Sequence, residues 1–186
     1  MVSKFETVLE HCKEFFDGHE VDLFSWNDGP IESAVDGFRV FRAAPGPKLG
    51  LWVYASVGAG TIEHEHGGSL EFVLVSPKES PRCVELLAMT TYYHLSRCLS
   101  IGHTLAMGEP WQDKSICDHW LVSTPYPFGP ELEICNFRDS HAHIAWLLPI
   151  TESERNFKVE HGLEDLERKF EDAKLAFCDI DREAVV

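Results

Sequence analysis

The chain has 186 residues, of which 44% are hydrophobic and 11% aromatic, a size and composition that suit one domain with its own core. This composition excludes a disordered, collagen-like or coiled-coil chain as a global description. The formal net charge of −15, from 16 Lys+Arg against 31 Asp+Glu, argues against direct nucleic-acid binding and favours a basic protein partner.

The N-terminal pattern predicts an amphipathic helix over residues 3–17. Ser3 and Glu6 have the spacing of a capping box, and apolar residues follow at helical intervals. Charged residues interrupt this segment, so we expect no secretory signal peptide, and no apolar run reaches the ~18 residues of a membrane span. We therefore expect a cytoplasmic protein that does not bind membranes.

Strands are predicted over 38–41, 49–57 and 70–75. Gly58-Ala59-Gly60 follows the second of them, as in a dinucleotide-binding loop, but Glu63 stands at the third glycine position. A negative side chain there would repel a pyrophosphate, so we interpret these glycines as a turn between strands.

The middle of the chain predicts a long helix that starts at Ser80-Pro81. Its apolar positions keep helical spacing and are Val84, Leu87, Ala88, Thr91, Leu95 and Cys98. A loop is expected over 102–111, and further strands over 118–124, 131–137 and 143–148.

C-terminal helices are predicted over 151–177, where Thr151 and Glu154 form a second capping-box pair. Strands clustered between terminal helices, without strict β-α alternation, predict an α+β fold: a single domain over 1–186 with a mixed central β-sheet flanked by α-helices. The six cysteines contain no Cys-x-x-Cys pair, which indicates buried thiols in a reducing compartment.

Two histidine pairs, His64 with His66 and His141 with His143, are weak candidates for metal binding. On a strand, an i, i+2 pair lies on one face about 6.5 Å apart, which suits two ligands of one ion. This spacing is unspecific, so structural or surface histidines are the favoured interpretation. No Gly-x-Ser-x-Gly or Gly-x-x-x-x-Gly-Lys pattern is present, and we predict no catalytic residues, no cofactor and no enzyme activity.

Two loops combine turn residues with large aromatic side chains. Trp111 lies in the 102–111 segment with Glu109, and Tyr126 lies between Pro125 and Pro127. Aromatic residues on loops are efficient interface anchors, although they also pack back onto sheets. We take Trp111, Tyr126, Glu109 and Asp118 as candidate partner-binding residues.

Several motifs in one order resemble the suppressor of fused domain family over residues 50–170. They are Trp52 to Gly58, Glu71 to Leu74, Pro81 to Leu87, Gly102 to Leu105, Gly108 with Pro110-Trp111, Asp118 to Val122, Thr124 to Tyr126, Trp146 to Glu154, and His161 to Leu163. Lys114 departs from this pattern, where a glycine is expected before Ser115.

The resemblance implies a cytoplasmic, non-enzymatic protein-binding module, similar to the N-terminal domain of the animal members. Short members of the family look bacterial, and many are proposed immunity proteins or antitoxins that neutralise toxins, often nucleases. The resemblance and the negative charge together predict an immunity protein that covers the surface of a basic toxin domain. The alternatives are a regulatory interaction protein with no toxin partner and a histidine-based metal hydrolase.

Overall fold

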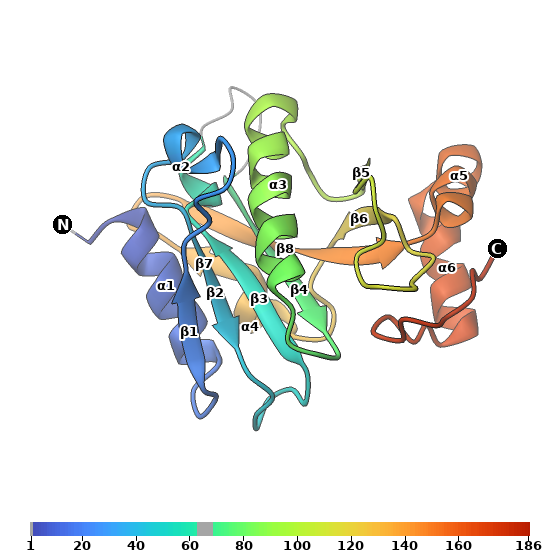
Figure 1. The fold of residues 1–186 in the computed structure, drawn as a ribbon, viewed down its shortest axis with the longest axis horizontal. Coiled ribbons are helices and arrows are strands. Elements are labelled where there is room, and N and C mark those ends of the chain that lie inside the picture. The colour runs from blue at the N-terminus through green and yellow to red at the C-terminus, as the bar shows by residue number, and fades with distance from the viewer. Residues whose placement is uncertain (1, 63–68) are drawn as a thin grey trace.

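Eight strands form one mixed sheet at the centre of the fold, shown in Figure 1 as a computed structural model that describes residues 2–62 and 69–186. The strand order is β1-β2-β3-β4-β8-β6-β5, and β7 also pairs with β8. Among the strand pairs of the described residues, only the central β4–β8 pair is parallel, and the others are antiparallel. The strands are β1 (Val21–Phe24), β2 (Arg39–Ala43), β3 (Trp52–Val57), β4 (Ser69–Ser76), β5 (Thr104–Ala106), β6 (His119–Ser123), β7 (Ile134–Asn136) and β8 (His141–Ile150).

Helices cover both faces of this sheet. They are α1 (Lys4–Phe15), α2 (Ile31–Ala34), α3 (Pro81–Arg97), α4 (Pro130–Glu133), α5 (Glu152–His161) and α6 (Leu163–Ala173). Figure 1 shows α3 in front of the sheet, α1 toward the β1 end, and α5 with α6 at the opposite end. Among the described residues, no helix is both long enough and apolar enough to cross a bilayer.

The two faces of the sheet belong to two separate apolar clusters. On β8, Ala145 and Leu147 pack on the α3 side, whereas Ile144, Trp146 and Leu148 pack on the side of α1 and α6. Because successive side chains of a strand point to opposite faces, a sheet covered on both faces needs continuous apolar strands rather than alternating ones. This arrangement confirms the predicted α+β class with a mixed central sheet.

Capping boxes begin the first and fifth helices. At α1, the Glu6 amide donates to Ser3 Oγ at 3.1 Å and the Ser3 amide donates to the Glu6 carboxylate at 2.8 Å. At α5, Thr151 and Glu154 make the same two bonds at 3.2 and 2.8 Å. Each box satisfies two amide groups that the first turn of a helix leaves unbonded.

Four parts of the chain differ from the sequence prediction. The first half of the strand predicted over 131–137 is the short helix α4, and only its second half is β7. Pro130 stands at the first helical position of α4, where its missing amide costs nothing. The short elements β1, α2 and β5 were not predicted.

The buried face of α3 begins as the apolar spacing predicts but ends differently. Val84, Leu87 and Ala88 are buried, yet Leu95 is exposed and His94 is fully buried in its place. His94 lies edge-on to Phe72 of β4, with ring centroids 5.3 Å apart, and its Nδ1 accepts the Leu99 amide. A hydrogen-bonded imidazole therefore takes the core position that we predicted for leucine.

The glycine turn after β3 encloses a buried carboxylate. The amides of Gly58 and Gly60 both donate to Glu71 Oε1 at 2.9 Å, and the Ser56 hydroxyl donates to its other oxygen. A Cβ on Gly60 would lie 2.9 Å from Ser69 Oγ, so the loop closes tightly only with glycine there. Burial raises the pKa of Glu71 to about 7 against the opposing effect of these hydrogen bonds.

All six cysteines are free thiols. Cys12, Cys83, Cys117 and Cys135 are buried, as predicted for them, whereas Cys98 and Cys178 are only partly buried. Burial raises the pKa of the Cys83 thiol to about 12 and that of Cys135 to about 11. Such thiols hold their protons at neutral pH and are weak nucleophiles.

Candidate protein-binding site

Trp111 is a core residue, so the expectation that it is an exposed anchor is wrong. Only 1% of its surface is accessible, its indole N–H donates to Ser115 Oγ at 3.1 Å, and its ring lies edge-on to Trp120 of β6. The loop returns toward β6 because the Trp111 amide also donates to the Cys117 carbonyl. The aromatic ring therefore packs against the sheet and is not exposed at the surface.

Tyr126 has the opposite environment. Its side chain is 65% exposed, and its hydroxyl donates to Glu167 of α6 at 3.3 Å. The turn that holds it is closed by bonds from the amides of Phe128 and Gly129 to the Pro125 carbonyl. The ring therefore stands beside α6, held by its backbone and by a bond to a second element.

An apolar groove opens next to Tyr126, between the end of the sheet and α6. We call it the Tyr126 groove; its volume is about 510 Å³. Its lining residues are Leu121, Ser123, Tyr126, Pro127, Trp146, Leu148, Glu167, Phe170, Glu171, Lys174, Leu175 and Phe177. They come from β6, the loop after it, β8, α6 and the segment that follows α6, so the groove exists only in the folded chain.

The chemistry of the groove is apolar with charged groups from one helix. Glu167 and Glu171 are one turn apart on α6, and Lys174 follows. Trp146 is 4% exposed, and its indole N–H has no hydrogen-bond partner in the described part of the chain. The Phe177 ring lies edge-on to Trp146 at a centroid distance of 4.8 Å.

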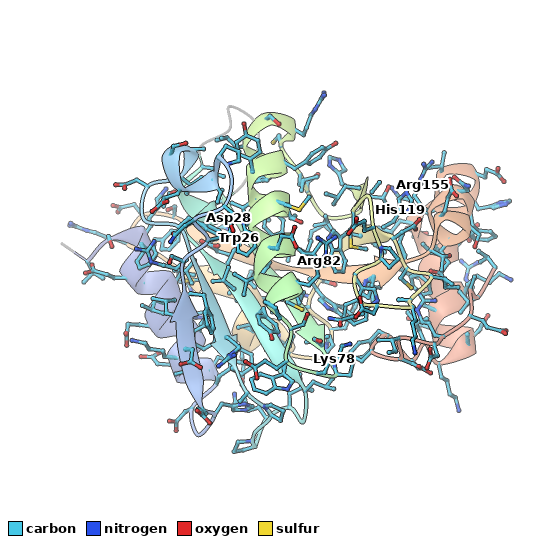
Figure 2. All side chains as sticks on the ribbon, viewed as in Figure 1. Trp26, Asp28, Lys78, Arg82, His119 and Arg155 are labelled. Carbon is cyan, nitrogen blue, oxygen red and sulfur yellow. The ribbon has the colours of Figure 1, made fainter. Side chains whose placement is uncertain are left out.

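The structure does not bring the other two candidates into this groove. Glu109 Oε2 is 3.8 Å from Arg82 Nη2 and lines a separate hollow at the start of α3 with Lys78. Asp118 Oδ1 is 2.7 Å from His119 Nδ1. Figure 2 shows Lys78 and Arg82 by α3, and His119 between α3 and α5. Of the four candidate partner-binding residues, Tyr126 alone lines this groove.

Of the two histidine pairs considered for metal binding, the pair on β8 lies within the described residues. His141 and His143 lie on one face of β8 with their Nε2 atoms 3.2 Å apart, whereas His64 and His66 lie outside the described residues. Across 2–62 and 69–186, no group of three or more His, Cys, Asp and Glu side chains is arranged to hold a metal ion. A structural or catalytic zinc needs three or four protein ligands.

A second exposed apolar surface was missed by sequence reasoning. Met89, Tyr92 and Tyr93 lie on the outer face of α3, and all three are exposed. We call these residues the α3 strip. Their i, i+3, i+4 spacing is the signal that identifies one helix face, but the buried face of α3 has the same spacing.

The chain is similar in sequence to known proteins. The sequence model of the family described as "Suppressor of fused protein (SUFU)" matches residues 32–183. Immunity protein YqcF of Bacillus subtilis (strain 168) is 24% identical over 173 residues, covering 87% of this chain and 86% of YqcF.

Solved structures share the fold over nearly the whole chain. A putative SUFU homologue from Neisseria gonorrhoeae FA 1090 is similar with a TM-score of 0.87 and 36% identity, over 98% of this chain and 97% of that one. A chain of the Sufu-Fu complex is similar with a TM-score of 0.70 and 13% identity, over 99% and 93% of the two chains. The second likeness is one of fold alone.

Proposed function

This chain belongs to the suppressor of fused protein family, and from that premise we propose that it is a non-enzymatic protein-binding module that acts in the cytoplasm as an immunity protein. It binds a basic toxin domain and blocks the toxin by covering its working surface. The observation that carries the proposal is an exposed apolar groove, bordered by carboxylates, on a molecule of net charge −15.

Three further observations support this function. The similar protein YqcF is named an immunity protein. The free cysteines with raised thiol pKa values suit a reducing compartment. The negative field of the whole molecule attracts a cationic surface and speeds the encounter, which an inhibitor of a toxin requires.

The test is the gene neighbourhood followed by co-expression. We expect a toxin gene beside the gene for this chain, and we expect co-expression of this chain to restore the growth of cells that produce the toxin domain. Purified toxin and this chain should form a complex in size-exclusion chromatography. A neighbourhood without a toxin, or toxicity that co-expression leaves unchanged, would contradict the immunity function and favour a regulatory interaction protein.

The affinity of that complex should depend strongly on salt. Raising the salt concentration from ~0.1 M to ~1 M shortens the Debye length from ~10 Å to ~3 Å and screens the attraction between exposed charges. We expect the dissociation constant to rise by at least about tenfold over this range, measured by isothermal titration calorimetry. A complex whose affinity is the same at both salt concentrations would contradict the electrostatic part of the proposal.

A further inference from the structure

We propose that the Tyr126 groove is the docking site for the partner, and that it accepts a protein segment with an apolar side chain between lysine or arginine residues. This inference rests on the proposed protein-binding function and adds to it a surface and a ligand chemistry. The occupant is a polypeptide rather than a lipid or a small metabolite.

The shape of the groove suits an anchor residue. Its volume of about 510 Å³ falls within the ~300–1,000 Å³ of sites that enclose a ligand. Leu121 and Leu148 line it from the sheet, Phe170 lines it from α6, and exposed Tyr126 stands at its border. Interface affinity concentrates where an apolar side chain fills such a pocket and large aromatic residues surround it.

The charge of the bordering helix determines what flanks the anchor. The acidic residues of α6 are Glu164, Asp165, Glu167, Glu171 and Asp172, and its basic residues are Arg168 and Lys169. Glu167 and Glu171 are the two acidic residues of this helix that line the groove. Lys174 is the one cation among the described residues of the lining, so the two carboxylates leave the groove with a net negative charge. A bound segment with cations beside its apolar anchor would place them against these carboxylates, whereas an acidic segment would be disfavoured.

Trp146 favours a polypeptide over a hydrocarbon. Its side chain lines the groove and is more than nine-tenths buried, and its indole N–H lacks a hydrogen-bond partner among the residues described. A buried donor without an acceptor is rare in folded proteins. The indole nitrogen is enclosed in the structure as it stands, so a ligand reaches it only when a neighbouring side chain shifts. A peptide would then supply a carbonyl acceptor at every residue, and a hydrocarbon chain would supply none.

Two synthetic peptides test the groove directly. They share a Leu-Phe-Leu core, flanked on each side by two lysines in one peptide and by two glutamates in the other. We expect the lysine peptide to bind at least about tenfold more tightly than the glutamate peptide in calorimetry. We also expect it to shift the NMR signal of the Trp146 indole N–H, assigned with the Trp146→Phe variant.

Paired variants separate the groove from the general field of the molecule. The double variant Glu167→Lys/Glu171→Lys reverses the charges in the groove. Glu164→Lys/Asp172→Lys reverses two carboxylates of the same helix that do not line it, so the total charge changes equally. We expect the first variant to weaken the lysine peptide at least about tenfold and the second by less than about threefold.

Four outcomes would contradict the groove as the docking site. Equal weakening by both double variants would assign the effect to long-range charge. Loss of binding in Tyr92→Glu/Tyr93→Glu, with the groove variants unaffected, would assign docking to the α3 strip. Decyltrimethylammonium that binds as tightly as the peptide would show a site for small cationic amphiphiles. Toxin binding that Glu167→Lys/Glu171→Lys leaves intact would overturn the groove but not the immunity function. Peptide binding without any toxin complex would overturn the immunity function but not the groove.

Discussion

Replacing Arg182 with alanine should lower the free energy of unfolding by about 3–5 kcal/mol, because it leaves a buried carboxylate without its cation. Arg182 Nη1 and Nη2 lie 2.7 and 2.8 Å from the two oxygens of Glu154, whose side chain is fully buried. Arg182 Nη2 also donates to the Pro149 carbonyl at 2.9 Å. Urea unfolding followed by circular dichroism measures the loss.

An exposed ion pair of the same chemistry is the matched control. Arg168 Nη1 is 2.8 Å from Asp165 on the surface of α6, and Arg168→Ala should cost at most about 0.5 kcal/mol. Equal decreases in the free energy of unfolding for Arg182→Ala and Arg168→Ala would show that burial does not increase the contribution of the Arg182–Glu154 pair to stability.

The same ion pair also affects the proposed binding site. Arg182 lies after α6 and ties the C-terminal segment to β8 and α5, and Val185 adds a bond from its amide to Glu154. Phe177, which lines the Tyr126 groove, belongs to this segment. Loss of the ion pair should therefore loosen one wall of the groove and weaken partner binding, even where the rest of the chain stays folded.

Local signals in the sequence located the helices better than the short strands. The two capping boxes identified the starts of α1 and α5 because the residues that satisfy a helix end are adjacent in sequence. β1 and β5 lie at the two edges of the sheet, with three or four residues each, mostly not buried. Such edge strands need no strong apolar pattern, since their stability comes from pairing with a neighbour.

The binding site was less predictable for a physical reason. Trp111 and Tyr126 lie in loops of similar composition, but Trp111 packs against Trp120 and bonds to Ser115 in the core, whereas Tyr126 is exposed and bonds to Glu167 at the surface. Which loop packs back onto the sheet depends on tertiary contacts. The groove itself combines residues between 121 and 177 from separate elements, so no local sequence pattern predicts it.

The stability of the protein should fall by about 3 kcal/mol between pH 4.5 and pH 7 relative to the Glu71→Gln variant. Burial raises the pKa of Glu71 from its usual 4.5 to about 7 in the folded protein. Between these values the unfolded chain has lost the proton and the folded chain still binds it, so the free energy of unfolding decreases as pH rises, by about 1.4 kcal/mol per pH unit. Above pH 7 both states are ionised and the difference stays constant.

Urea unfolding at half-unit pH steps measures this difference, and Glu160→Gln is the control because Glu160 is exposed. The control should follow the wild-type pH dependence, whereas Glu71→Gln should lack the decrease. Parallel curves for wild type and Glu71→Gln would show that Glu71 does not titrate in this range. The hydroxyl of Ser56 and the amides of Gly58 and Gly60 stabilise the charged form. A decrease with rising pH would therefore show that, for a fully buried carboxyl, desolvation outweighs three hydrogen bonds.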